Sequence, residues 1–201
     1  MGSAGDRSGE LEEAQQEIDA AHSSDPDDPV VHIAQALYEL LLANAEAASG
    51  TPDRARAALD RAHAAFDRAR TLAPDLFWVY LVGADVELQL GQPVVALATT
   101  RRGLELDPYQ PAMHGRLIDV YLQMDDVEAA GQAATTLAKL DAGGFWSGRA
   151  EARILWRRGL LEEAEERFLD LRERWAGAAW IHSLLIDFYA DTGRPELAAR
   201  E

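Results

Sequence analysis

Residues 91–108 read GQPVVALATTRRGLELDP and carry the signals of one helix with defined ends. Gly91 provides a turn, and Pro93 fits the first position of a helix, where a missing backbone N–H costs nothing. Pro108 closes the segment because proline cannot continue a helix. The stretch therefore predicts one short helix between two turns.

The same pattern recurs along the chain with a period of 34 residues. An alanine stands at one place in five successive periods, a glycine or aspartate precedes four of these alanines by five residues, and a proline recurs at the exit. The columns are Ala62, Ala96, Ala130, Ala164 and Ala198; Gly91, Asp125, Gly159 and Gly193; and Pro74 and Pro108. A fixed period of this length indicates stacked supersecondary units.

Each period is predicted to hold two helices joined by a tight turn. The first helix is rich in aromatic and aliphatic residues, as in 77–90 and 113–124. The second has apolar residues three and four apart, as in 161–171. Asp125 with Glu128 is predicted to form a capping box where one second helix begins. No stretch alternates as a strand does, so the predicted fold class is all-α.

With its alanine column, turn glycines and exit prolines in one register, the sequence resembles the tetratricopeptide repeat (TPR) family over nearly its whole length. The resemblance implies a right-handed superhelical solenoid of helix–turn–helix repeats. It predicts one domain over 10–201, made of a lone helix (10–22), repeats (29–74, 75–108, 109–142 and 145–176) and a truncated repeat (179–201). Residues 1–9 are expected to be a disordered terminus or a tag remnant. The repeat over 29–74 holds about a dozen extra residues and is expected to have a long first turn, with one helix over 29–48 and another that opens at Thr51-Pro52 and reaches about Leu72.

Composition narrows the function classes. The 201 residues carry a formal net charge of −16, include no cysteine, and contain Lys139 as their only lysine. Disulfide scaffolds, thiol catalysis and cysteine-ligated zinc are excluded. The acid surplus works against binding nucleic acid or an anionic membrane. No signal peptide or membrane-spanning run is visible, so a cytoplasmic location is the default expectation.

The sequence contains no motif for catalysis or cofactor binding. No two of the five histidines lie three or four residues apart, as a helical metal site requires. Gly143-Gly144 lacks the Lys-Ser or Lys-Thr that follows in a phosphate-binding loop, and no nucleophile elbow is present. We therefore expect no enzyme activity, no cofactor and no metal, and a protein or peptide as the partner.

The resemblance also implies where a partner binds. In the TPR family the first helix of each repeat lines a concave groove, and its second, fifth, ninth, twelfth and thirteenth places point into that groove. The residues predicted on this basis to bind a peptide or a partner's helix are Trp78, Asp85, Asp119, Trp146, Arg149, Arg153, Trp156, Arg157, Trp180 and Asp187. Tryptophan and arginine often carry the binding energy of an interface. The alternative is that the tryptophans pack between helices.

One stripe within this set favours an acidic partner. Trp146, Arg149, Arg153 and Trp156 are three, four and three residues apart, so they share one helix face. Guanidinium groups beside aromatic planes suit an acidic, partly apolar peptide. The alternative interpretation is internal: Arg153 would pair with the aspartates at the ninth places of the two neighbouring repeats.

A structural role is the alternative function. The final repeat is expected to expose Leu184, Leu185 and Phe188 where its second helix is cut short, and the lone first helix lacks a partner. Solenoids normally end in polar capping helices. Uncapped ends predict end-to-end homo-oligomers, or a spacer within a larger protein.

Overall fold

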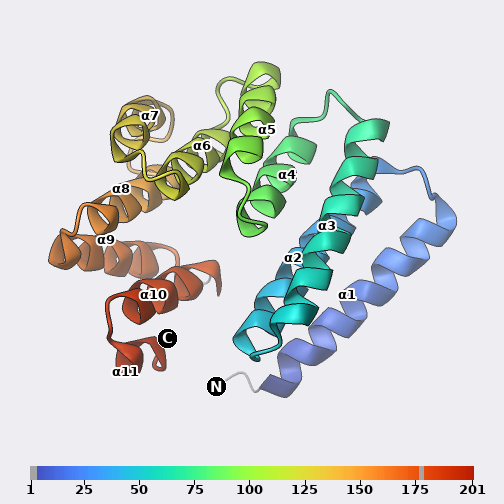
Figure 1. The fold of residues 1–201 in the computed structure, drawn as a ribbon, viewed down its shortest axis with the longest axis horizontal. Coiled ribbons are helices and arrows are strands. Elements are labelled where there is room, and N and C mark those ends of the chain that lie inside the picture. Colours follow the sequence, from blue (N-terminus) through green and yellow to red (C-terminus); the bar gives the residue numbers. More distant parts are fainter. Residues whose placement is uncertain (1–3, 177–178) are drawn as a thin grey trace. The chain divides into compact units, whose positions relative to one another are not determined.

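The chain is composed of helices that pack as consecutive pairs (Figure 1). The structure is a computed structural model that describes residues 4–176 and 179–201, and no strand occurs among them. The helices are α1 (Ala4–Ser24), α2 (Pro29–Ala48), α3 (Pro52–Leu72), α4 (Phe77–Gln89), α5 (Pro93–Leu106), α6 (Pro111–Gln123), α7 (Val127–Leu140), α8 (Phe145–Arg157), α9 (Leu161–Arg174), α10 (Ala179–Asp191) and α11 (Pro195–Ala198). They form two compact units, Met1–Pro108 with α1–α5 and Tyr109–Glu201 with α6–α11. The predicted all-α class is confirmed, and the single domain over 10–201 stays a prediction.

A residue in the left-handed region closes the turn inside each pair. Gly50, Gly91, Gly159 and Gly193 have φ between 71° and 75°, and Asp125 has φ 62°. Glycine adopts this conformation without a steric penalty, and aspartate tolerates it better than most residues. The glycines and the aspartate predicted at the turns therefore share one backbone conformation, with positive φ. The predicted cap at Asp125 is wrong, because a left-handed residue cannot take the extended N-cap conformation. Asp126 caps α7 instead, accepting the Ala129 N–H at 2.9 Å.

The extra residues of the first repeat lengthen its helices and leave its turn short, so the predicted long first turn is wrong. α2 has 20 residues and α3 has 21, against 13 in α4 and 14 in α5. Each helix gains seven residues, which is about two helical turns, so the buried face continues without a break. The additional stretches, 42–48 and 52–58, are rich in alanine, which favours continued helix.

The first helix begins earlier than predicted. α1 starts at Ala4 rather than at residue 10, so residues 4–9 are helical and not disordered, while residues 1–3 lie outside the described part. A single glycine inside a helix costs only about 1 kcal/mol relative to alanine. Because extending an existing helix is much easier than starting one, Gly9 does not stop it. α1 packs against α2.

The alanine column marks the closest helix contacts. Ala62, Ala96, Ala130 and Ala164 are completely buried, and Ala198 is partly buried against the last core cluster. In unit 1 the core lies among α2, α3 and α4, and in unit 2 it forms two clusters, centred on α6–α8 and on α8–α10.

The last repeat corrects a further prediction. Leu185 and Phe188 were expected to be exposed, yet both are fully buried, and Leu184 is partly buried. The rings of Phe168 and Trp156 from the preceding repeat cover Phe188, with centroids 5.3 and 5.5 Å away. Neither Leu185 nor Phe188 therefore provides an exposed apolar surface for self-assembly.

Candidate functional site

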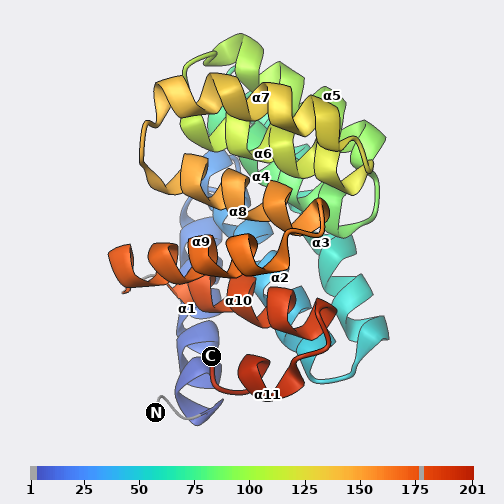
Figure 2. The ribbon, with the colours of Figure 1, turned by 90° about the vertical axis from the view of Figure 1, so that its left-hand side faces the viewer.

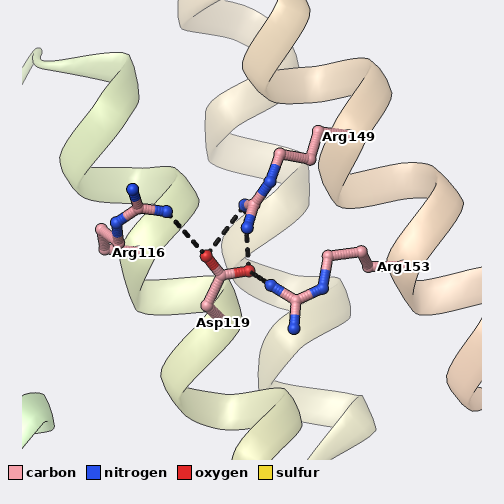
Figure 3. A network of polar contacts seen from close by, with 4 residues as sticks. All are labelled: Arg116, Asp119, Arg149 and Arg153. Carbon is pink, nitrogen blue, oxygen red and sulfur yellow. Dashed lines mark hydrogen bonds and ion pairs between the residues drawn. The ribbon is translucent and has the colours of Figure 1, made fainter. Parts of the chain in front are cut away.

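Three arginine side chains converge on the carboxylate of Asp119 in unit 2 (Figure 3). α6 carries Arg116 and Asp119 one turn apart, and α8, which packs against it, carries Arg149 and Arg153 one turn apart. The Nη1 atom of Arg149 donates to both carboxylate oxygens, at 3.0 and 2.8 Å. Arg116 Nη1 lies 3.1 Å from Oδ2, and Arg153 Nη1 donates to Oδ1. We call these four residues the Asp119 cluster.

The cluster is buried but carries more positive than negative charge. The Asp119 side chain is 5% exposed, and those of Arg149 and Arg153 are 11% and 26% exposed. Burial favours the neutral acid, yet the charges of Arg149, Arg153 and Arg116 outweigh it and hold the pKa of Asp119 at about 2. Burial, together with repulsion from the other two arginines, lowers the pKa of Arg149 to about 10 despite its bond to Asp119. At neutral pH Arg149 and Arg153 therefore share the negative charge of Asp119.

The charge of Arg153 also acts on Asp187, the aspartate at the ninth place of the next repeat. Burial raises the pKa of Asp187 on α10, and the positive charge of Arg153 opposes that rise. The pairing of Arg153 with Asp119 is part of the internal arrangement that the sequence left open as an alternative, and Arg149, for which no such pairing was predicted, binds the same carboxylate. The single carboxylate of Asp119 does not neutralise both Arg149 and Arg153, so a positive charge remains on this pair of arginines.

Trp146 packs at the junction between α6 and α8. It lies beside Arg116 and Arg149, whose guanidinium carbons are 5.4 and 5.9 Å from its ring centroid. A Cβ added to Gly115 would come within 2.7 Å of Trp146 Cε3, so glycine makes room for the ring. Trp146 is half-buried, and it supports the arginines from one side through packing and cation–π contact.

Trp156 and Arg157 lie further along α8. The indole Nε1–H of Trp156 donates to an Asp191 carboxylate oxygen at 3.0 Å, which ties α8 to α10. Arg157 forms an exposed ion pair of 2.6 Å with Asp125, and such pairs contribute little stability. The half-buried Trp156 adds apolar surface next to the cationic cluster.

Two other predicted residues, Trp78 and Asp85, belong to α4 in unit 1, where Trp78 is 51% exposed beside Phe77. The Trp180 side chain lies outside the part that the structure describes. Arg116 was missed by the sequence analysis because it does not occupy a place that points into the TPR groove. Its position three residues before Asp119 on one helix was the available signal.

Two further properties concern the described part of the chain. None of the helices there is both long enough and apolar enough to cross a membrane. Nor do three histidine, aspartate or glutamate side chains gather there in a way that would hold a metal ion.

Comparison with known proteins places this fold. No family model matches the sequence, and no curated protein matches it. Among solved structures, the chain is similar to one in the APC/C hetero-tetramer Cut9–Hcn1, with a TM-score of 0.67 and 13% identity over 95% of this chain and 35% of that one. It is also similar to a thermophilic TPR protein of Thermus thermophilus, with a TM-score of 0.67 and 18% identity over 85% of this chain and 91% of that one.

A third similar structure is YrrB, described as a TPR protein with an unusual peptide-binding site. Its TM-score is 0.51, with 18% identity over 90% of this chain and 86% of that one. The chain thus spans about a third of the Cut9–Hcn1 chain and most of the two shorter ones. These similarities define the class: the chain has the tetratricopeptide repeat fold, as its alanine, glycine and proline columns predicted.

Proposed function

We propose that this chain is a protein-interaction scaffold that binds an acidic, partly apolar segment of a partner protein at the Asp119 cluster. The observation that carries the proposal is that Arg149 and Arg153 share the single carboxylate of Asp119 in a chain of net charge −16. Its fold is shared with a peptide-binding TPR protein and with a member of a hetero-tetramer, which supports a role in protein interaction.

Arg153 is the residue through which a partner would engage the cluster. It is the most exposed of the three arginines, and among the described residues its only hydrogen bond is the one from Nη1 to Asp119. A guanidinium group has five N–H donors, so most of them remain for an incoming carboxylate. Arginine binds carboxylates in a bidentate manner, and Trp156 one turn away supplies apolar contact. Asp119 itself is too deeply buried to touch a partner and serves to position the arginines.

Surplus charge also explains why binding would be favourable. The side chain of Arg149 is 11% exposed, and its guanidinium group shares the Asp119 carboxylate with Arg153, which leaves part of its desolvation uncompensated. A partner carboxylate would supply a second counter-charge in a partly desolvated site, where electrostatic attraction is stronger than in water. Binding a partner segment in this way needs no catalytic residue.

The decisive experiment compares Arg153→Gln with Arg101→Gln. Both variants lose one positive charge, but Arg101 is an exposed residue of α5 in unit 1, outside the cluster. Proteins captured from a lysate of the source organism would be quantified by mass spectrometry and then mapped on peptide arrays. Each acidic peptide would be paired with a version in which asparagine and glutamine replace the acids.

We expect Arg153→Gln to reduce binding of the acidic peptides about tenfold or more while the control binds like wild type. Equal binding by the two variants, or equal binding of the acidic and neutral peptides, would remove the cluster from the binding site.

A further inference from the structure

A second surface of unit 2, on the other side of α8, has the form of a binding groove. α7 and α9 lie on either side of α8, and Figure 2 shows the three helices as neighbouring layers. The space between α7 and α9 has a volume of about 810 Å³, with α8 as its floor and Gly143–Gly144 at one end. We call it the α7–α9 groove. Floor residues 148, 151, 155 and 158 are three and four apart and form a different stripe from Arg149, Arg153 and Trp156.

The groove is open because small residues line it. α7 contributes Gly131, Ala134 and Ala138, and the floor contributes Gly148. A Cβ on Gly148 would meet Leu171 Cδ2 at 2.9 Å, so glycine is needed where α9 approaches the floor. The guanidinium of Arg158 reaches α7, since its Nη2 lies 3.4 Å from the place where a Cβ on Gly131 would stand. One end of the groove is therefore marked by Arg158.

The groove is cationic in a strongly acidic chain. Four basic and two acidic residues line it, and both acids are already paired: Glu151 with Arg167 at 3.3 Å, and Asp170 with Arg174 at 3.4 Å. Lys139 and Arg158 are exposed and make no ion pair with any residue of the described part. Lys139 is also the only lysine of the sequence. Two unneutralised cations therefore face the same groove.

The spacing of these cations indicates the form of the ligand. Arg158 reaches Gly131, and Lys139 follows eight residues later on α7, which corresponds to about 12 Å along the helix. An extended chain advances about 3.3 Å per residue, so side chains four residues apart lie on one face and about 13 Å apart. A short extended segment therefore matches the spacing of the two cations.

We propose that the α7–α9 groove binds an extended acidic segment of a partner protein, with carboxylates four residues apart, one paired with Arg158 and the other with Lys139. The small residues of α7 allow the segment's backbone to approach closely. This site is separate from the Asp119 cluster and uses the opposite face of α8, so a partner at one site leaves the other accessible.

The test uses a defined probe and the whole chain. The probe is a fluorescein-labelled peptide of about nine serine and proline residues with two aspartates four residues apart, because proline keeps it extended. A matched peptide carries asparagine at both positions. Fluorescence anisotropy at low and high salt would measure their affinities for wild type, Lys139→Gln, Arg158→Gln and Arg101→Gln, the last as an exposed charge-matched control.

We expect the aspartate probe to bind wild type about tenfold or more tightly than the asparagine probe, and high salt to weaken that preference. Lys139→Gln and Arg158→Gln should each reduce it several-fold, and Arg101→Gln should not. Ala138→Trp, at an exposed position on the groove wall, should block the probe by filling the groove while the helical signal is unchanged.

Several outcomes would overturn the proposal. They are equal affinity for both probes, no binding at millimolar protein, or a loss of binding in Arg101→Gln as large as in the groove variants. Arg153→Gln separates this proposal from the previous one. If that variant alone abolished binding, the probe would occupy the Asp119 cluster, and the groove proposal would fail while the proposed function stood.

Discussion

The buried carboxylates of Glu87 in unit 1 and Asp119 in unit 2 have opposite surroundings. Glu87 on α4 and Asp119 on α6 are 1% and 4% exposed. Glu87 accepts one hydrogen bond, from Thr99 Oγ1 at 2.9 Å, and its second oxygen, Oε2, has no hydrogen-bond partner among the described residues. Asp119 is bound by three arginines. Burial raises the pKa of Glu87, whereas the arginines hold the pKa of Asp119 at about 2.

The difference shows that burial alone does not set a charge state. At Glu87 the loss of hydration has the largest effect on the pKa, because the single hydrogen bond from the Thr99 hydroxyl does not replace the lost water. At Asp119 the same loss is outweighed by neighbouring charge. Glu87 therefore weakens the folded state at neutral pH, while Asp119 supplies a counter-charge to the three arginines that contact it.

The largest effect is expected from removing that counter-charge. Asp119→Asn keeps the side chain's shape but removes the carboxylate charge that Arg116, Arg149 and Arg153 all contact, and breaking a buried pair in this way costs about 3–5 kcal/mol. Urea unfolding followed by circular dichroism would measure it. Asp125→Asn is the control: it removes the exposed pair with Arg157, asparagine tolerates the left-handed backbone, and the loss should stay below about 0.5 kcal/mol. Similar losses in both variants would contradict this account of Asp119.

A second prediction concerns acid. The folded pKa of Asp119, about 2, lies below its ordinary value of 3.8, so the stability it contributes is present above about pH 4 and is lost as the pH falls toward 2. The shift corresponds to about 2 kcal/mol, of which about half should be lost by pH 3. The difference in unfolding free energy between wild type and Asp119→Asn should shrink accordingly between pH 6 and pH 3. A difference independent of pH would mean that the charge of Asp119 is not what stabilises the site.

Glu87 should behave in the opposite way. Because burial raises its folded pKa above the ordinary value, the folded state gains stability as the pH falls through that raised pKa. Glu87→Gln should therefore stabilise the chain at pH 7 by about 1 kcal/mol, since the amide oxygen still accepts from Thr99 and no charge is buried. The gain should vanish in acid, where Glu87 is itself protonated. Glu105→Gln, at an exposed position, is the control and should change little. If Glu87→Gln were less stable than wild type at pH 7, the folded state would stabilise the charged Glu87 carboxylate, and the expected gain would be contradicted.

Much of this fold could be predicted from the sequence because turns and close helix crossings impose strict local requirements. Left-handed turns require glycine or a tolerant residue such as Asp125, and crossings require small residues such as Ala130, so both appear as columns. The bounds of the long helices α2 and α3 were also predicted, because a proline opens each of them. The long turn between them was wrong, because the extra residues lengthen both helices by about two turns and leave the connection short.

The candidate site was predicted less completely. Asp119, Arg149 and Arg153 could be placed near one another because corresponding places of adjacent repeats are neighbours. Their burial could not be foreseen, because it depends on how Trp146 packs against Gly115. Nor did the repeat pattern separate the two faces of α8, so the groove beside Arg158 became visible only in three dimensions.

The smallest change in stability is expected for Arg153→Gln, the variant that should reduce partner binding most. Arg153→Gln leaves Asp119 with Arg149 and Arg116, removes one of three mutually repelling cations, and empties no core volume, because Arg153 is 26% exposed. Lost attraction and lost repulsion should nearly cancel, so the free energy of unfolding should change by no more than about 0.5 kcal/mol. Arg149→Gln, at a more buried site with two bonds to Asp119, should cost more than 1 kcal/mol by the usual scale of charge-assisted hydrogen bonds. Both values can be measured by urea unfolding beside the peptide-binding assay. If Arg153→Gln lost stability as Arg149→Gln does, the two arginines would be equivalent parts of the core, and a fall in partner binding would report unfolding and not a lost contact.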